Sequence, residues 1–253
     1  MPARSHYRRV TDELRDAIER GVYPPGSLLP GEHEIGAAHG VSRATVQNAI
    51  KVLRGEGLVH PRRGRAGAGG GTYVRAIPQI RRRAVTRYRQ GAREANAARG
   101  AFDTEIRSQG MVPRSDVLVA VVDAPERVAE LLGTRQVVRR ERRMYADDIP
   151  VQLAPSYIPA SIAEGTVLEQ ADTGPGGMLS RLAELGYPQS RFTESVRVRR
   201  ATRDEQEFLD LADDAPVMEI WHTGWTAAGL PVEVTVHAVP AYGWVLDYEW
   251  DDE

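Results

Sequence analysis

The sequence of 253 residues contains no cysteine, which excludes disulfides and cysteine metal sites, and we expect no bound metal. No apolar run is long enough to cross a membrane, and residues 1–10 lack the apolar region of a signal peptide. We therefore expect a cytoplasmic protein with no membrane partner. Aromatic residues make up only 6% of the chain, but a hydrophobic content of 42% is enough for packed cores. The length accommodates two domains.

The net charge of −2 conceals a division between two parts of the chain. Residues 1–99 carry 19 basic and 8 acidic residues, a net charge of +11, and residues 100–253 carry 14 and 27, a net charge of −13. A basic segment attracts the phosphate backbone of nucleic acid, whereas an acidic one is repelled by it. A run of charged residues is often only a solvated surface. The basic charge therefore indicates nucleic-acid binding only if a sequence motif also does.

Residues 37–46 read AAHGVSRATV and predict two helices joined by a tight turn. Gly40 suits the left-handed position that ends a helix, and Ser42 suits the N-cap of the next one. Apolar residues then recur at helical spacing up to residue 53 and give this second helix a core-facing side. Its other side carries Arg43, Thr45 and Gln47, which are side-chain types that read base edges in the major groove.

The flanking residues complete a winged helix-turn-helix. An apolar stripe predicts a first helix over residues 5–20, and Gly31 followed by Glu34 resembles half of a capping box at the start of the second helix. Two short strands then enclose the segment PRRGRAGAGGG, whose arginines can reach a phosphate or the minor groove. This glycine run lacks the Lys-Ser/Thr ending of a phosphate-binding loop, so a nucleotide site is not favoured.

Residues 5–75 resemble the DNA-binding domain of the GntR family of bacterial repressors. The resemblance rests on PGSLLP at 25–30, VSRATV at 41–46 and the pattern L-x-x-E-G-L-V at 53–59. Gly31 departs from the family's usual Ser or Thr cap, and the wing is several residues longer than is usual. The resemblance implies DNA contacts by His33, Ser42, Arg43, Thr45, Gln47, Arg63 and Gly64, to which the basic wing adds Arg62.

Residues 76–100 contain six arginines between 81 and 93 and few apolar anchors, so we interpret them as a basic linker between domains at 1–75 and 101–253. The linker either contacts DNA or docks on the acidic second domain, and the sequence leaves both open. Beyond it, strands joined by hairpins predict an antiparallel sheet covered on one face, and hence an α+β protein. The expected strands are 116–122, 136–145, 150–153, 192–199, 217–227 and 231–238, and the expected helices are 125–132, 179–185 and 204–211.

This second part resembles the UTRA effector-binding domain of HutC-type GntR regulators, which has a chorismate-lyase-like fold. The markers are weaker here: R-x-x-x-A-D-x-x-P at 142–150, SYIP at 156–159 and G-x-P-V-E at 229–233. The resemblance implies a domain that binds a small metabolite and thereby changes the affinity for DNA. It places Phe102, Asp103, Arg142, Met144 and Glu233 at the ligand cleft.

Three cleft positions depart from relatives that bind sugar phosphates. Asp103 puts a negative charge where backbone amides take an anion, Met144 replaces a second arginine, and Ala154 stands where an acidic residue is common. We therefore expect an effector other than a phosphosugar, bound by one cation and one carboxylate in an otherwise apolar cleft. Arg142 has an alternative interpretation as a surface arginine paired with Glu141 or Asp147.

The leading prediction is a transcriptional regulator that binds operator DNA and responds to a small-molecule effector. Of the possible regulators, a repressor is favoured. We expect a homodimer on an inverted repeat, because one recognition helix reads too few base pairs for genomic specificity. A constitutive DNA-binding dimer and a lyase-like enzyme with a DNA-binding domain remain as alternatives. No catalytic set of side chains stands out and the six histidines are scattered, so we expect neither enzymatic activity nor a cofactor.

Overall fold

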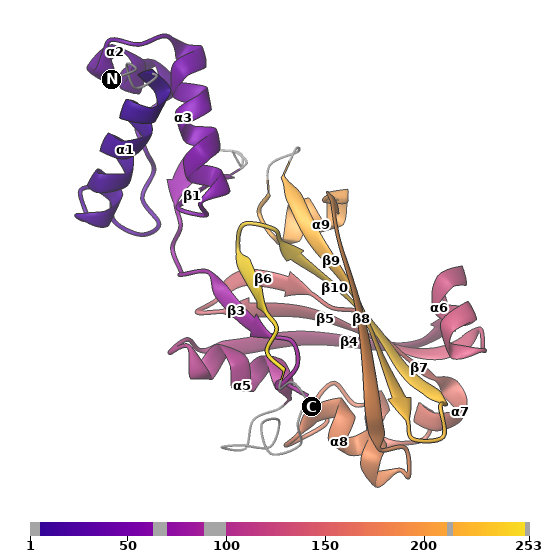
Figure 1. The fold of residues 1–253 in the computed structure, drawn as a ribbon. Helices are drawn as coiled ribbons and strands as arrows, with labels where there is room; N and C mark the ends of the chain where they lie inside the picture. Colours follow the sequence, from indigo (N-terminus) through magenta and orange to yellow (C-terminus); the bar gives the residue numbers. More distant parts are fainter. Residues whose placement is uncertain (1–5, 63–69, 89–99, 212–214, 251–253) are drawn as a thin grey trace. The chain divides into compact units, whose positions relative to one another are not determined.

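The computed structural model describes residues 6–62, 70–88, 100–211 and 215–250 (Figure 1). The chain divides into two compact units, residues 1–79 with 201–215 and residues 80–200 with 216–253. In the described part of the chain, no helix is both long and apolar enough to cross a membrane.

The first unit is a small helical bundle with a hairpin. Its core contains the fully buried Val10, Val46 and Leu53, which the helical period places on one side of their helices. The three helices and the hairpin confirm the elements predicted for this part of the sequence. They are α1 (His6–Glu19), α2 (Glu32–His39), α3 (Arg43–Gly55), β1 (Val59–Arg62) and β2 (Gly71–Val74), and α9 (Arg203–Phe208) groups with the same unit.

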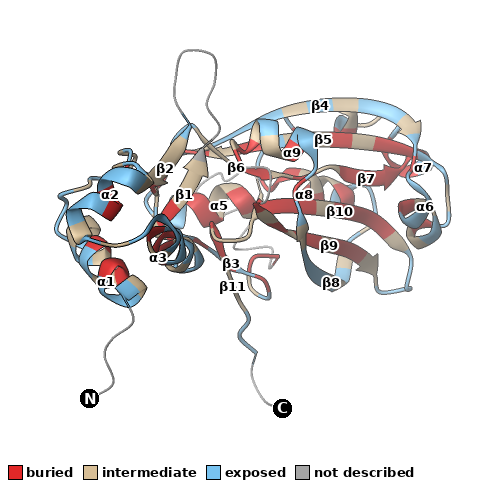
Figure 2. Cartoon of the chain, turned by 90° about the horizontal axis from the view of Figure 1, so that it is seen from above, coloured by how far each residue is buried: buried red, intermediate tan, exposed pale blue. Residues whose placement is uncertain are grey.

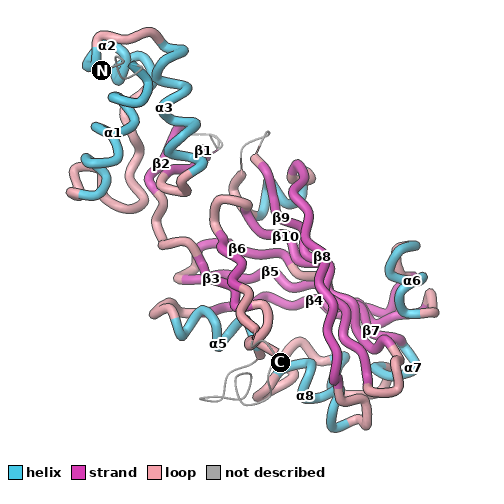
Figure 3. The backbone as a smooth tube through the Cα atoms, in the orientation of Figure 1, coloured by secondary structure: helices cyan, strands magenta, loops and turns pink. Residues whose placement is uncertain are grey.

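The second unit is built on a seven-stranded antiparallel sheet with the order β4-β5-β6-β10-β9-β8, in which β7 pairs with β10 and β5 (Figure 3). Figure 2 shows β9 and β10 mostly buried and the edge strand β4 mostly exposed. The strands are β4 (Pro113–Asp123), β5 (Gln136–Ala146), β6 (Ile149–Leu153), β7 (Ser156–Pro159), β8 (Gln189–Arg200), β9 (Pro216–Thr226) and β10 (Pro231–Pro240).

Helices cover both faces of this sheet, which corrects the expectation of a single covered face. The helix α6 (Glu126–Leu132) packs against Val137, Tyr157 and Val234. The neighbouring side chains Val138 and Ile158 point to the opposite face, because successive side chains of a strand alternate. That face packs against α7 (Ala160–Ala163), the 3-10 helix η2 (Val167–Glu169) and α8 (Gly177–Glu184).

A second, two-stranded sheet joins distant parts of the sequence. Its strands β3 (Ile80–Arg83) and β11 (Trp244–Asp247) pair in parallel. The helix α5 (Ala101–Ser108) lies beside β3 and bonds to its backbone. Residues 80–88, which we interpreted as part of a linker, therefore belong to the second unit.

Candidate functional site

The turn between α2 and α3 has the local geometry that its residues predict. Gly40 ends α2 with a positive φ of 64°, a conformation that glycine adopts without strain. Ser42 caps α3, and its side chain accepts a hydrogen bond from the backbone N–H of Thr45 at 3.3 Å. At the start of α2, Glu34 accepts from the backbone N–H of Gly31 at 2.8 Å, the half of the capping box that glycine permits.

The predicted DNA-contacting residues of the helices lie on one accessible region of the first unit. The N-cap Ser42 and the α3 residues Arg43 and Gln47 are exposed, as is His33 on α2, and Thr45 is half-buried. Glu32, His33 and Arg43 line a shared hollow between the two helices. Sequence reasoning did not single out Glu32, although its carboxylate accepts hydrogen bonds from Arg43 and Gln47.

The wing is described only in part. Its strands β1 and β2 pair in register from Val59 with Val74 to Arg62 with Gly71. Arg62 thus ends β1, whereas Arg63 and Gly64, the other wing residues predicted to meet DNA, lie outside the described residues.

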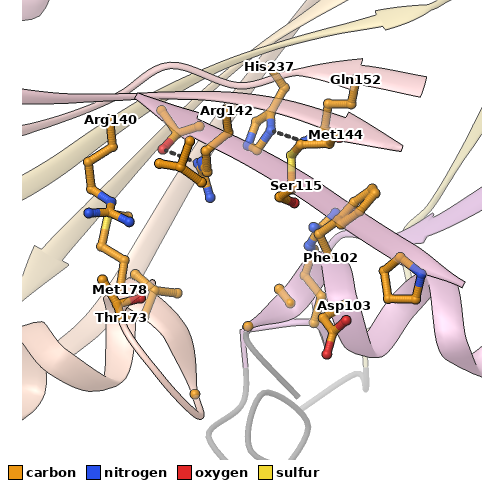
Figure 4. Close-up of a pocket in the computed structure, with 18 of the residues that line it drawn as sticks. Phe102, Asp103, Ser115, Arg140, Arg142, Met144, Gln152, Thr173, Met178 and His237 are labelled. Atoms are coloured by element: carbon orange, nitrogen blue, oxygen red, sulfur yellow. Dashed lines mark hydrogen bonds between the residues drawn. The ribbon is translucent and has the colours of Figure 1, made fainter. Parts of the chain in front are cut away.

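The second unit contains a cavity of about 760 Å³ over the face of the large sheet that carries α8. All five residues predicted for the ligand cleft line it: Phe102, Asp103, Arg142, Met144 and Glu233. Figure 4 shows Arg142 and Met144 on the sheet, and Phe102 and Asp103 at the start of α5. Asp103 lies in the first turn of this helix, and its carboxylate pairs with Arg107 at 3.2 Å.

Arg142 is held by the sheet and not by a surface ion pair. Its Nε donates to the carbonyl of Ala154 at 3.1 Å, and its Nη2 donates to the hydroxyl of Ser156. Glu141 pairs instead with Arg139. The Nη1 of Arg142 has no partner among the described residues, so this N–H group is available to a ligand. Burial lowers the pKa of Arg142 from its ordinary value, an effect that the charge of Glu233 opposes.

Buried polar atoms near Arg142 also lack partners. Glu233 is 1% exposed; its Oε1 accepts from Thr235, while its Oε2 has no hydrogen bond among the described residues. The Oε1 of Gln152 and the Nε2 of His237 are likewise buried and unsatisfied within the described part of the chain. Buried polar groups normally have hydrogen-bond partners, so these side chains can bind a polar ligand or water in the cavity.

The hydrogen bonds of Gln152 fix the proton of His237. The Nε2 of Gln152 donates to the sulfur of Met144 and lies 3.2 Å from the Nδ1 of His237, which must then accept. Burial lowers the pKa of His237 well below its ordinary value, and the charges of nearby arginines add to this. The neutral ring therefore carries its proton on Nε2, which is a donor at the cavity wall.

The cavity is more polar than the apolar cleft that we expected, which corrects that prediction. Five arginines line it, and each has at least one partner within the protein. Arg87, Arg107 and Arg114 pair with carboxylates. Arg140 donates to the carbonyls of residues 168, 170 and 171, and burial lowers its pKa to about 10. Arg142 pairs with no carboxylate and keeps a free Nη1, and the Nε and Nη1 of Arg87 also make no hydrogen bond among the described residues.

A buried network connects the cavity to β3. Arg82, which is fully buried, donates to Tyr88 at 2.9 Å and to Glu194. The ring of His222 stacks on Tyr88 at 4.3 Å, and its Nδ1 lies 3.3 Å from Glu194. Its Nε2 lies 3.5 Å from Glu233 in the cavity wall. Sequence reasoning missed this network, because its members are far apart along the chain.

Comparison with known proteins identifies the chain. Residues 6–74 match the model of bacterial regulatory proteins of the gntR family, and residues 108–242 match the UTRA domain. The chain belongs to the GntR family and carries a UTRA domain. It is 30% identical to an HTH-type transcriptional regulator of Streptomyces coelicolor over 99% of this chain and 95% of that one. The HTH-type transcriptional repressor NagR of Bacillus subtilis is 27% identical, over 93% and 89% of the two chains.

Solved structures agree with this assignment. The crystal structure of a GntR-family regulator covers 99% of both chains at 26% identity with a TM-score of 0.60. PhnF from Mycobacterium smegmatis, at 20% identity, shares the fold with the same score over 96% of this chain and all of that one. The protein is thus a DNA-binding transcriptional regulator with the predicted α+β fold, and not an enzyme.

No group of three or more histidine, aspartate or glutamate side chains that could hold a metal ion occurs among the described residues.

Proposed function

We propose that this regulator is a cytoplasmic repressor that binds an inverted-repeat operator as a homodimer and releases it when a small carboxylate-bearing metabolite enters the cavity. The free Nη1 of Arg142 is the observation that carries the effector proposal. His237 adds a second donor for an anionic oxygen, while Glu233 and Gln152 offer acceptors for hydroxyl or amino groups of the ligand.

The distribution of partners favours a carboxylate over a phosphate. A phosphate ester carries about −1.5 to −2 charges at neutral pH and three acceptor oxygens, which call for several free donors. The other lining arginines are paired with carboxylates or carbonyls, Arg107 with Asp103 among them, and Asp172 adds a further negative charge to the lining. Of these four arginines, Arg87 keeps two nitrogens without a hydrogen bond among the described residues. The effector is therefore still expected to be other than a phosphosugar, but it should be more polar than an apolar cleft would accept.

The position of β3 supports a route from the cavity to the DNA-binding unit. The N-terminal stretch of the first unit ends at Gln79, and β3 starts at the next residue. Glu105 on α5 accepts from the backbone N–H of Arg83 at 3.0 Å, and Gln109 at the C-cap of this helix accepts from that of Arg81 at 2.8 Å. Because residues at the start of α5 line the cavity, a ligand that moves this helix also moves β3. By linkage, an inducer must bind the DNA-free protein more tightly.

The test uses operator DNA selected by the protein from a random duplex library. Hydroxy- and amino-carboxylates of two to six carbons, together with glucosamine-6-phosphate, are screened for thermal stabilisation and for DNA release. A carboxylate hit should bind Arg142→Ala roughly 10- to 100-fold more weakly, since hydrogen bonds to a charged group are lost. Arg139→Ala, on the same strand but paired with Glu141, is the matched control and should bind normally. Tight binding of the phosphosugar alone contradicts the assigned effector class, and a protein that ignores the whole panel fits the constitutive alternative.

A further inference from the structure

One carboxylate oxygen of the first unit binds two side chains of α3, the helix that reads the operator in the function proposed above, on which this inference rests. The Oε2 of Glu32 accepts from the Nε of Arg43 at 2.6 Å and from the Nε2 of Gln47 at 3.0 Å. Glu32 is the first residue of α2, so its backbone is fixed by the helix start. Arg43 and Gln47 are four residues apart and lie on the same face of α3.

Fold stability does not account for this arrangement. The side chain of Arg43 is 77% exposed, and exposed ion pairs contribute little to stability. A carboxylate on a DNA-facing surface also opposes the approach of phosphates. Glu32 therefore weakens general attraction to DNA, which calls for a compensating gain in recognition.

The hydrogen bonds to Glu32 leave free the groups of Arg43 and Gln47 that are needed to read bases. With its Nε taken, Arg43 keeps both Nη groups, which form the end of the fork that pairs with O6 and N7 of guanine. Gln47 keeps its Oε1 and one N–H, the pair that reads N6 and N7 of adenine. Fixing both side chains before binding also reduces the rotamer freedom that they lose in the complex.

We propose that Glu32 is a positioning residue for base readout, which orients Arg43 and Gln47 and raises specificity at the expense of non-specific affinity. Glu32→Ala should therefore change the affinity for the operator and the affinity for non-specific DNA in opposite directions. Its affinity for the selected operator falls on the order of tenfold, because the oriented base contacts are partly lost. Its affinity for a non-specific duplex of equal length rises, because a negative charge is removed.

Binding-site selection on the full-length protein provides the decisive measurement. Glu32→Ala should relax the base preference at the same base pairs that Arg43→Ala and Gln47→Ala relax. Glu32→Gln keeps a neutral hydrogen-bond acceptor and should retain part of the base preference. This variant replaces Glu32→Ala in the measurement if the alanine variant does not fold. Glu34→Ala removes the same charge from the same helical turn without touching either side chain, so it should raise non-specific affinity and leave base preference unchanged.

Three results overturn the proposal. One is an unchanged ratio of specific to non-specific affinity in both Glu32 variants. Another is an equal loss of base preference in Glu34→Ala. The third is relaxation of a base pair that neither Arg43 nor Gln47 reads, because Glu32 would then contact a base itself.

Discussion

The buried ion pair between Arg82 and Glu194 should stabilise the second unit. Burial alone raises the pKa of Glu194, but contact with His222 and the charge of Arg82 outweigh it and lower the pKa from 4.5 to about 2. A shift of this size corresponds to about 3 kcal/mol of folding free energy, at about 1.4 kcal/mol per pKa unit. Loss of one partner of a buried pair gives a similar expectation of about 3–5 kcal/mol.

Glu194→Gln should therefore lower the free energy of unfolding at pH 7 by about 3 kcal/mol. Because folding lowers this pKa, the stabilisation is present above pH 4.5 and is lost as the pH falls toward 2. The variant should lack that part of the pH dependence. All four tryptophans lie in the second unit, so their fluorescence during urea unfolding reports on this unit.

Glu184→Gln is the control, because Glu184 is 61% exposed and pairs with Arg181 at the surface. It should change stability by less than about 0.5 kcal/mol. If Glu194→Gln unfolds at the wild-type urea concentration at pH 7 and keeps the wild-type loss of stability below pH 4.5, the buried pair is not a source of stability.

Three further predictions concern the two sites. Arg43→Ala should reduce operator affinity by about 1–3 kcal/mol with no change in folding, as measured by gel-shift titration and circular dichroism, and an unchanged affinity would remove Arg43 from base readout. The double variant Arg62→Ala/Arg63→Ala should flatten the dependence of log affinity on log salt by up to about two counterions, and an unchanged slope refutes phosphate contacts by the wing. Gln109→Ala removes both hydrogen bonds to the backbone of Arg81, so the amide of Arg81 should exchange with solvent at least about tenfold faster, whereas equal exchange rates contradict the clamp on β3.

Local rules made the first unit predictable. Gly40 and Ser42 act within one turn of the chain, and the apolar period of α3 identifies its buried face without knowledge of any partner. The turn at Asp147 and Asp148, both with positive φ, is a local feature of the same kind and lies where the sequence predicts a hairpin. The cleft positions were found by resemblance, since spacing alone does not bring Phe102 near Glu233.

Tertiary structure alone decided the polar interior of the second unit. A basic run at 81–83 resembles a solvated linker, yet pairing with β11, some 160 residues later, buries Arg82 against Glu194. The short helix α5 and the strands β3, β7 and β11 have too few residues for a clear period and form through contacts with distant segments.

The contact between Glu32 and Arg43 likewise depends on the angle between two helices, which neither helix encodes by itself. The sequence therefore determined the local elements and the family, and it predicted which helix reads DNA. Which charges are buried, paired or left free was decided by contacts between residues that are distant along the chain, because burial and pairing depend on position in space.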